Sequence, residues 1–192
     1  MRRTPVLAAI LVLALGPLVP GMAAAADWYT VAAARVRISA QHPAFPGQRP
    51  AVSVRMPDDI ARTAQSDWLR FGKLSEPGPV FTATYQTQYR RFPSYTLRDS
   101  LWHKEAFRAY DVIPLGEGPI VRSDFGPVET MKVAIRKGDM ERQCGYWHWQ
   151  DSDNRSYFDG WYCPPVGQEV TDSDIKRSVW AVRWRTQEAR AP

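Results

Sequence analysis

The sequence predicts an α+β, β-rich domain, built mainly from antiparallel sheet with one or two short helices and one disulfide-braced hairpin. Sixteen prolines and twelve glycines divide the chain into short segments, which favours strands and turns over long helices. Several segments alternate apolar and polar residues, the period of a strand with one buried face. The only two cysteines, Cys144 and Cys163, bracket a segment that holds three of the eight tryptophans.

The N-terminus has the organisation of a secretory signal peptide. Arg2 and Arg3 precede an apolar run over residues 6–19, and small residues follow at 23–26. That run is shorter than the roughly 20 residues that a membrane span needs. We therefore expect cleavage after Ala26, which leaves residues 27–192 as a single exported globular domain without a transmembrane segment.

We expect strands wherever apolar and polar residues alternate clearly. In the clearest case, Val52, Val54 and Met56 alternate with Ala51, Ser53 and Arg55. The expected strands are residues 30–39, 51–56, 81–92, a short piece within 118–127, and 128–137, with a turn at Gly138 and Asp139.

Two segments are expected to be helical, and one fits neither period. Residues 57–71 start with Pro57 and repeat apolar residues at four-residue spacing up to Trp68, which favours a short helix. In residues 171–190, Thr171 or Asp172 can cap a helix, although 179–184 also alternates like a strand. The cap favours the helix. Residues 95–113 have no clear period.

The segment between the cysteines is predicted to be an antiparallel hairpin. In an exported chain, two cysteines indicate one disulfide. If Cys144 lies opposite Cys163, then Tyr146 faces Trp161, His148 faces Asp159, and residues 151–156 form the loop. Alternation then gives two faces: Cys144, Tyr146, His148, Asp159, Trp161 and Cys163 on one, and Trp147, Trp149, Phe158 and Tyr162 on the other.

The first of these faces carries the candidate binding residues. Tyr146, His148, Asp159 and Trp161 would form a flat aromatic surface with a polar edge, suited to a sugar ring or a protein partner. The alternative is that these aromatic side chains belong to the core. A third interpretation is a hydrolase or lyase in which Asp159 orients His148 as a general base. No nucleophile motif such as G-x-S-x-G accompanies that pair, so no catalytic residue is assigned.

Metal and nucleic-acid sites are not expected. Asp151, Asp153, Asn154 and Asp159 supply oxygen atoms, but Arg155 and the missing glycine break the EF-hand pattern. His42, His103 and His148 have no metal-ligand spacing. The formal net charge of +5 is spread over scattered basic residues rather than clusters. No cofactor is therefore predicted.

The run DFGPVETMKVAI (124–135), followed by Cys144 and then GWYC (160–163), resembles a set of small exported proteins of Gram-negative bacteria that have no assigned activity. The resemblance covers residues 124–163 and implies export and a disulfide-braced β unit. It implies no catalytic residue, ligand or substrate. The sequence thus predicts a periplasmic or secreted, non-enzymatic envelope protein that binds a polysaccharide or a protein partner.

Overall fold

The computed structural model describes residues 29–30, 36–55, 65–88, 91–102, 104 and 107–185. Helices make up a small part of this region, and strands a large one. The strands are β1 (Tyr29–Thr30), β2 (Ile38–Ala40), β3 (Ala51–Arg55), β4 (Gln65–Phe71), β5 (Val80–Thr87), β6 (Asp111–Glu117), β7 (Val121–Ser123), β8 (Gly126–Lys137), β9 (Met140–Gln150), β10 (Ser156–Cys163) and β11 (Val182–Trp184). The helices are α1 (Leu97–Trp102) and α2 (Asp172–Trp180).

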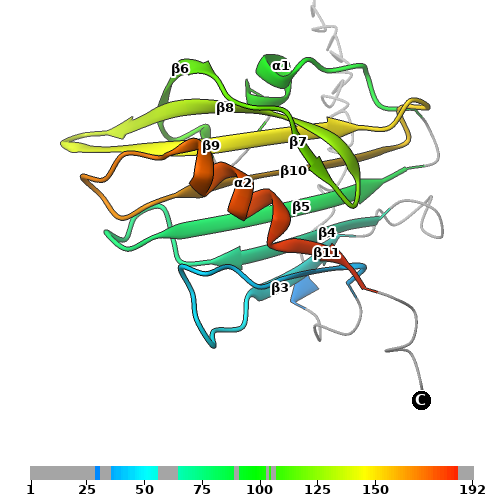
Figure 1. Ribbon diagram of the computed structural model, residues 1–192, viewed down its shortest axis with the longest axis horizontal. Coiled ribbons are helices and arrows are strands. Elements are labelled where there is room, and N and C mark those ends of the chain that lie inside the picture. Colours follow the sequence, from blue (N-terminus) through cyan, green and yellow to red (C-terminus); the bar gives the residue numbers. More distant parts are fainter. Residues whose placement is uncertain are drawn as a thin grey trace, which may run out of the picture.

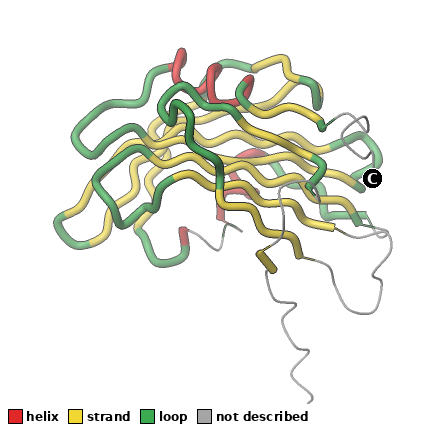
Figure 2. Tube along the Cα trace, turned by 90° about the horizontal axis from the view of Figure 1, so that it is seen from below, coloured by secondary structure: helices red, strands yellow, loops and turns green. Residues whose placement is uncertain are grey.

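The described strands build one large antiparallel sheet and one small one. The large sheet has nine strands in the order β1-β3-β4-β5-β10-β9-β8-β6, and β7 also pairs with β8. β11 pairs with β2 in the small sheet. Figure 1 shows the long strands side by side with α2 in front of them, and Figure 2 shows the same strands as one continuous twisted layer.

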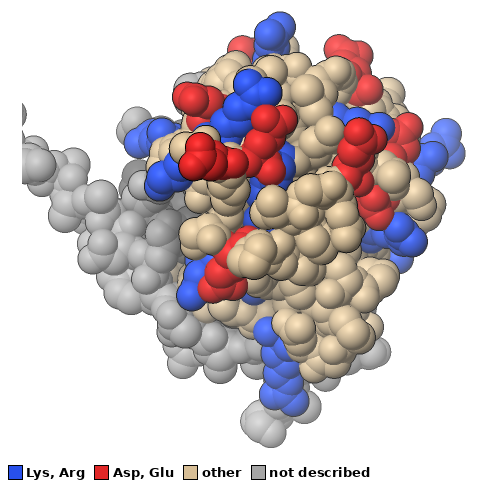
Figure 3. Space-filling model, turned by 90° about the vertical axis from the view of Figure 1, so that its left-hand side faces the viewer, with Lys and Arg blue, Asp and Glu red and all other residues tan. Residues whose placement is uncertain are grey.

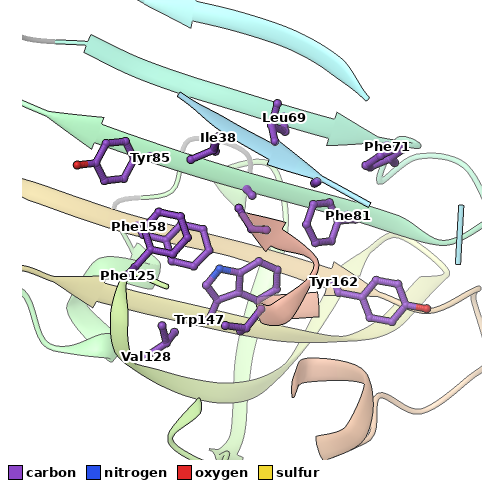
Figure 4. Packing of buried hydrophobic residues seen from close by; sticks show 14 of the residues in the cluster. Ile38, Leu69, Phe71, Phe81, Tyr85, Phe125, Val128, Trp147, Phe158 and Tyr162 are labelled. Atoms are coloured by element: carbon purple, nitrogen blue, oxygen red, sulfur yellow. The ribbon is translucent and has the colours of Figure 1, made fainter. Parts of the chain in front are cut away.

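The α2 face of the sheet carries the larger hydrophobic core. Phe125 stacks on Phe158 with ring centroids 4.1 Å apart, and Phe81 lies 5.8 Å from Trp147. Figure 4 shows these rings together with Leu69, Tyr85 and Tyr162 over the central strands. The helix adds Ile175 and Val179 to this core. This face therefore holds the side of the hairpin that the sequence predicted to be wholly aromatic.

The opposite face carries a second core beneath α1. Leu97 and Leu101 of α1 and Phe107 pack there against residues of β8, β9 and β10, including both cysteines. Both faces of the sheet bury apolar surface. This explains why the central strands β5, β10 and β9 contain long runs of consecutive buried residues rather than an alternation of buried and exposed ones.

The predicted hairpin and its disulfide are confirmed. Cys144 and Cys163 are bonded, with their Cα atoms 4.1 Å apart. His148 pairs with Asp159 and Tyr146 pairs with Trp161 in the β9–β10 ladder. The connecting loop is organised by Asp151, whose side chain accepts hydrogen bonds from the backbone N–H groups of Arg155 and Ser156.

The capped C-terminal helix is also confirmed, although a strand follows it. The Thr171 hydroxyl accepts from the Asp174 N–H, and the Asp174 carboxylate accepts from the Thr171 N–H, which is a reciprocal capping box. The helix ends at Trp180, and the period-two pattern after it forms β11. Each of the two patterns therefore describes one part of the segment.

Two sequence predictions need correction. The expected helix over residues 57–71 is wrong for its second half, because Gln65–Phe71 forms the central strand β4; residues 57–64 lie outside the described part. The single strand expected over 30–39 is replaced by β1 and β2, which pair with different partners, β3 and β11. The proposed signal peptide and His103 also lie outside the described residues.

The segment without a clear period, residues 95–113, supplies α1 and the start of the edge strand β6. Thr96 and Asp99 cap α1 through the same reciprocal hydrogen bonds as those at α2. Within the described residues, no helix is both long and apolar enough to cross a membrane.

Candidate functional site

The four candidate binding residues lie on one face, as the register predicted, but they are not exposed. The exposed fractions are 0% for Tyr146, 5% for His148, 0% for Asp159 and 4% for Trp161. The cover comes from α1 and the segment after it, because the Tyr146 hydroxyl lies 2.9 Å from that of Ser100. The burial favours the alternative, that these aromatic side chains belong to the core, over an open aromatic surface. Any ligand of these residues must approach from the border of the covered area.

Asp159 is the electrostatic centre of this covered region. Its Oδ2 atom accepts a hydrogen bond from the Lys104 ammonium group, which is itself mostly buried. Burial raises the pKa of Asp159, while the neighbouring Lys104 opposes that rise. The pair compensates two charges that would each be costly to bury alone.

His148 lies beside this ion pair as a neutral ring. Burial, and secondarily the positive charge of Lys104, lowers the pKa of His148 to about 4. Within the described part of the chain neither ring nitrogen has a hydrogen-bond partner, although Asp159 is directly across the ladder. The hydrogen bond that a His148–Asp159 general base requires is thus not formed in this structure. The hydrolase or lyase hypothesis remains an alternative that only an activity measurement can test.

A small cleft opens where the cover ends, beside Trp161. It measures about 260 Å³, and its floor comes from β4, β5 and β10. We call it the Trp161 cleft. It is lined by Trp68, Arg70, Lys73, Leu74, Ser75, Val80, Thr82, Tyr110 and Trp161. This cleft combines three aromatic rings with two basic side chains, and one of its residues is among those predicted from the sequence.

Two residues that line the Trp161 cleft each have a buried polar atom without a partner among the described residues. Thr82 Oγ1 and Trp161 Nε1 are both buried, and neither makes a hydrogen bond within the described region. Buried polar atoms are normally satisfied, and each one left without a partner costs roughly 1–3 kcal/mol. Thr82 and Trp161 are direct neighbours in the β5–β10 ladder, so the two unsatisfied groups belong to one place.

Arg70 completes the same row across the sheet. It pairs with Thr82 in the β4–β5 ladder, and its guanidinium group lies 4.9 Å from the centre of the Trp68 ring. It is half-buried, and it forms no ion pair with a described residue. Lys73, at the rim, is exposed and bridges to Glu76 at 3.1 Å. Among the residues that the structure describes, Arg70 is therefore the cation of this cleft that lacks a counterion.

A larger cleft of about 560 Å³ lies between α1 and the strands β6 and β8. We call it the α1–β6 cleft. Its lining includes Arg98, Leu115, Glu117, Ile120 and Glu129, so aliphatic side chains alternate with charges of both signs. None of the unsatisfied buried polar atoms found in the described residues belongs to this lining. Its larger size favours this cleft as a binding site. The Trp161 cleft, however, brings aromatic rings and unsatisfied polar atoms of the described residues together in one place.

His42 is the second buried histidine, and its partners are fully determined. Its Nδ1 accepts from the Ala44 N–H, and its Nε2 lies 2.8 Å from the Ser178 hydroxyl, which donates to the Asp174 carbonyl. The ring is therefore neutral with the proton on Nε2. Burial, with a smaller contribution from Arg177, lowers the pKa of His42 to about 4. Its stacking on Tyr162 at 4.6 Å makes it a core residue.

The charge distribution gives no sign of a nucleic-acid surface on the side of the molecule that Figure 3 presents. Basic and acidic side chains are interspersed there, and the lower part of the view is largely uncharged. A phosphate-binding surface needs clustered positive charge. In the described residues, no group of three or more His, Cys, Asp or Glu side chains is placed to hold a metal ion.

Comparisons with known proteins give no match: no family model, no curated protein and no solved structure is similar to this chain. The resemblance to small exported proteins of Gram-negative bacteria is therefore neither supported nor opposed. The site has to be interpreted from its own geometry.

Sequence reasoning identified Trp161 but missed Trp68, Arg70, Thr82 and Tyr110. Trp68 and Arg70 lie in the segment that was expected to be helical, and they reach Trp161 only because β4 and β10 both flank β5. One signal was available: the alternation of Trp68 and Arg70 with Leu69 and Phe71 predicts a strand that exposes the first pair.

Proposed function

We propose that this protein is a non-enzymatic binding protein of the bacterial envelope, either periplasmic or secreted, and that its Trp161 cleft binds one sugar ring of a polysaccharide. The observation that carries the proposal is the cleft itself, which is lined by Trp68, Tyr110 and Trp161 together with Thr82. Among the described residues, Thr82 Oγ1 and Trp161 Nε1 have no hydrogen-bond partner. Sugar rings combine apolar C–H faces with hydroxyl groups, so they suit such a surface.

The size of the cleft limits the ligand. At about 260 Å³ it is smaller than the roughly 300–1,000 Å³ of sites for drug-sized molecules. It suits a single ring, such as a terminal residue or one unit of a chain that continues into solvent. The disulfide in the structure is compatible with an oxidising, exported location.

Thermal shift and calorimetry with purified residues 27–192 against a panel of envelope glycans would test the proposal. At least one glycan should raise the melting temperature of the native protein, and the Tyr110→Ala variant should abolish that rise. Leu115→Ala, in the α1–β6 cleft, is the matched control and should bind normally. If no glycan raises the melting temperature or gives a binding signal, the proposal of a polysaccharide ligand is wrong. A protein partner would then be the remaining candidate among envelope components.

The second function from the sequence, a hydrolase or lyase using His148 and Asp159, has its own test. If an activity is found, His148→Ala must abolish it. An activity that survives this substitution would exclude the assignment.

A further inference from the structure

We infer that the ligand of the Trp161 cleft is an acidic sugar, in which a ring carboxylate binds to Arg70, Trp161 and Thr82. This inference rests on the proposed function and adds the chemical class of the ligand to it. It follows from three features of the described residues: the row that these side chains share, their hydrogen-bonding character, and the charge that they leave uncompensated.

The three side chains are neighbours across the sheet. The ladders pair Arg70 with Thr82 and Thr82 with Trp161, so all three project from the same face. Directly opposed residues in antiparallel strands have Cβ atoms about 5 Å apart. A row of three therefore spans roughly 10 Å, which is the scale of one sugar ring with its substituents.

Their hydrogen-bonding character is mainly that of donors. The indole N–H of Trp161 can only donate, the guanidinium group of Arg70 can only donate, and the Thr82 hydroxyl can do either. Neither the indole nor the hydroxyl finds a partner among the described residues, although Thr82 is only 1% exposed. A set of donors without acceptors calls for a ligand rich in acceptors.

The positive charge of Arg70 also favours a ligand that carries a carboxylate. Arg70 is half-buried against Trp68 and has no carboxylate partner in the described part of the chain. The guanidinium group favours planar, bidentate acceptors, and a carboxylate is the acceptor that it fits best. Lys73 at the rim of the cleft is paired with Glu76, so the uncompensated charge of the cleft is that of Arg70. The contact of the Arg70 guanidinium group with the Trp68 ring also restricts the position of that group.

The free protein bears a stability cost at this site, which provides an independent measurement. Because Thr82 Oγ1 is buried without a partner in the described part of the chain, replacing Thr82 by the isosteric valine removes the desolvation cost of the hydroxyl group. The Thr82→Val variant should therefore melt about 2–4 °C higher than the native protein. It should also bind the ligand more weakly, a combination typical of binding sites.

The experiment compares matched pairs of sugars by NMR titration of ¹⁵N-labelled residues 27–192. The probes are D-glucuronate and D-galacturonate against D-glucose and D-galactose, with acetate as a bare carboxylate. Uronates should bind at least about tenfold more tightly than the neutral sugars and shift the indole N–H signal of Trp161, assigned with Trp161→Phe. The Arg70→Gln variant should bind uronates less than about threefold more tightly than the matched neutral sugars. Arg98→Gln, in the α1–β6 cleft, should keep the native ratio of affinities.

Each other outcome has a definite meaning. Equal binding of uronates and neutral hexoses would overturn the carboxylate inference while leaving the proposed function intact. Acetate binding as tightly as the uronates would show an adventitious anion site, and a preference lost in Arg98→Gln but kept in Arg70→Gln would place the ligand in the other cleft; both overturn the inference. Binding of none of these sugars, together with a silent glycan panel, would overturn the proposed function as well.

Discussion

His148 and Asp159 lie directly opposite each other on β9 and β10, yet they share no hydrogen bond, and Oδ2 of Asp159 is instead bound to Lys104. In this structure, therefore, Asp159 forms a buried ion pair with Lys104, and the neutral ring of His148 lies beside that pair. Buried polar and charged groups such as these determine several of the predictions below, for the free energy of unfolding and for its dependence on pH.

The Lys104–Asp159 pair should behave as one unit. Asp159→Ala leaves a mostly buried ammonium group without its partner, and breaking such a pair typically costs about 3–5 kcal/mol. The double variant Lys104→Met/Asp159→Leu, which removes both charges, should recover most of that loss. Urea denaturation of Lys104→Met, Asp159→Leu and the double variant gives the coupling energy. Strictly additive effects would contradict a direct interaction.

The protein should lose stability as the pH falls from about 6.5 to 4. His42 and His148 both have a folded-state pKa of about 4, lowered mainly by burial, whereas an unfolded histidine titrates near 6.5. In this window the unfolded chain takes up protons that the folded protein excludes, so the free energy of unfolding decreases with acidification. Each histidine contributes roughly 2 kcal/mol between pH 7 and pH 4.5.

Denaturant titrations at these two pH values, repeated with His42→Asn, isolate the contribution of one ring. The substituted protein starts with a lower free energy of unfolding, because it loses the hydrogen bonds to Ala44 and Ser178. Its further loss on acidification should nevertheless be smaller than that of the native protein. An identical pH dependence in both proteins would show that His42 does not titrate as its burial implies.

The disulfide should contribute about 3 kcal/mol, the value that chain entropy gives for a loop of this length. Cys144 and Cys163 are 19 positions apart, and both are fully buried. The Cys144→Ala/Cys163→Ala variant should lose that amount in denaturant unfolding. Buried sulfur atoms should also resist reductant until the protein unfolds. Intact-mass measurement of native protein under non-reducing conditions is the control, and two free thiols there would contradict the bond.

The hairpin could be predicted because its information is local. Two cysteines fix the register of β9 and β10, and alternation from Cys144 then places Trp147 and Phe158 on the α2 face, where the structure has them. What covers the other face could not be predicted in this way, since Ser100 and Phe107 approach it from a segment without a clear period.

β4 was misread for a physical reason. The four-residue spacing of apolar residues up to Trp68 favoured a helix. The inward row of the actual strand also includes Asp67, which is completely buried, and a charged residue is unusual in a core strand. The structure resolves the conflict with Arg37, whose Nε atom lies 2.6 Å from the Asp67 carboxylate. A partner 30 positions away cannot be inferred from local periodicity. The Trp161 cleft escaped prediction for the same reason, since it depends on the long-range order β4-β5-β10.

Gly160 should not tolerate even a methyl group. A Cβ atom built there would lie 2.3 Å from the Thr82 carbonyl oxygen and 2.4 Å from the Trp147 ring. The backbone and a fully buried indole cannot yield easily, so Gly160→Ala should cost about 3 kcal/mol or more. Gly78→Ala is the matched control, because a Cβ there meets nothing within 4 Å. Similar melting temperatures for the two variants would contradict the close packing.

Arg142 should stabilise both the fold and the Trp161 cleft, because it holds the loop between β4 and β5 in place. Its buried guanidinium group donates to the carbonyl oxygens of Leu74, Glu76, Gly78 and Pro164. It thereby holds the β4–β5 loop, from which Leu74 lines the cleft, against the strand that carries Cys144. Hydrogen bonds to a charged group contribute roughly 1.5–3 kcal/mol each, so Arg142→Met should destabilise the protein by about 3 kcal/mol or more.

The same substitution should also weaken ligand binding at temperatures where the variant is still folded, because the loop loses its anchor. Calorimetric titration with the best ligand of the glycan panel, performed well below the melting temperature, measures this effect. Arg136→Met is the matched control: its guanidinium group pairs with Glu141 on the exposed surface, where ion pairs contribute little. It should leave both stability and affinity nearly unchanged. An Arg142→Met protein that binds with native affinity would show that the cleft is shaped by β4, β5 and β10 alone.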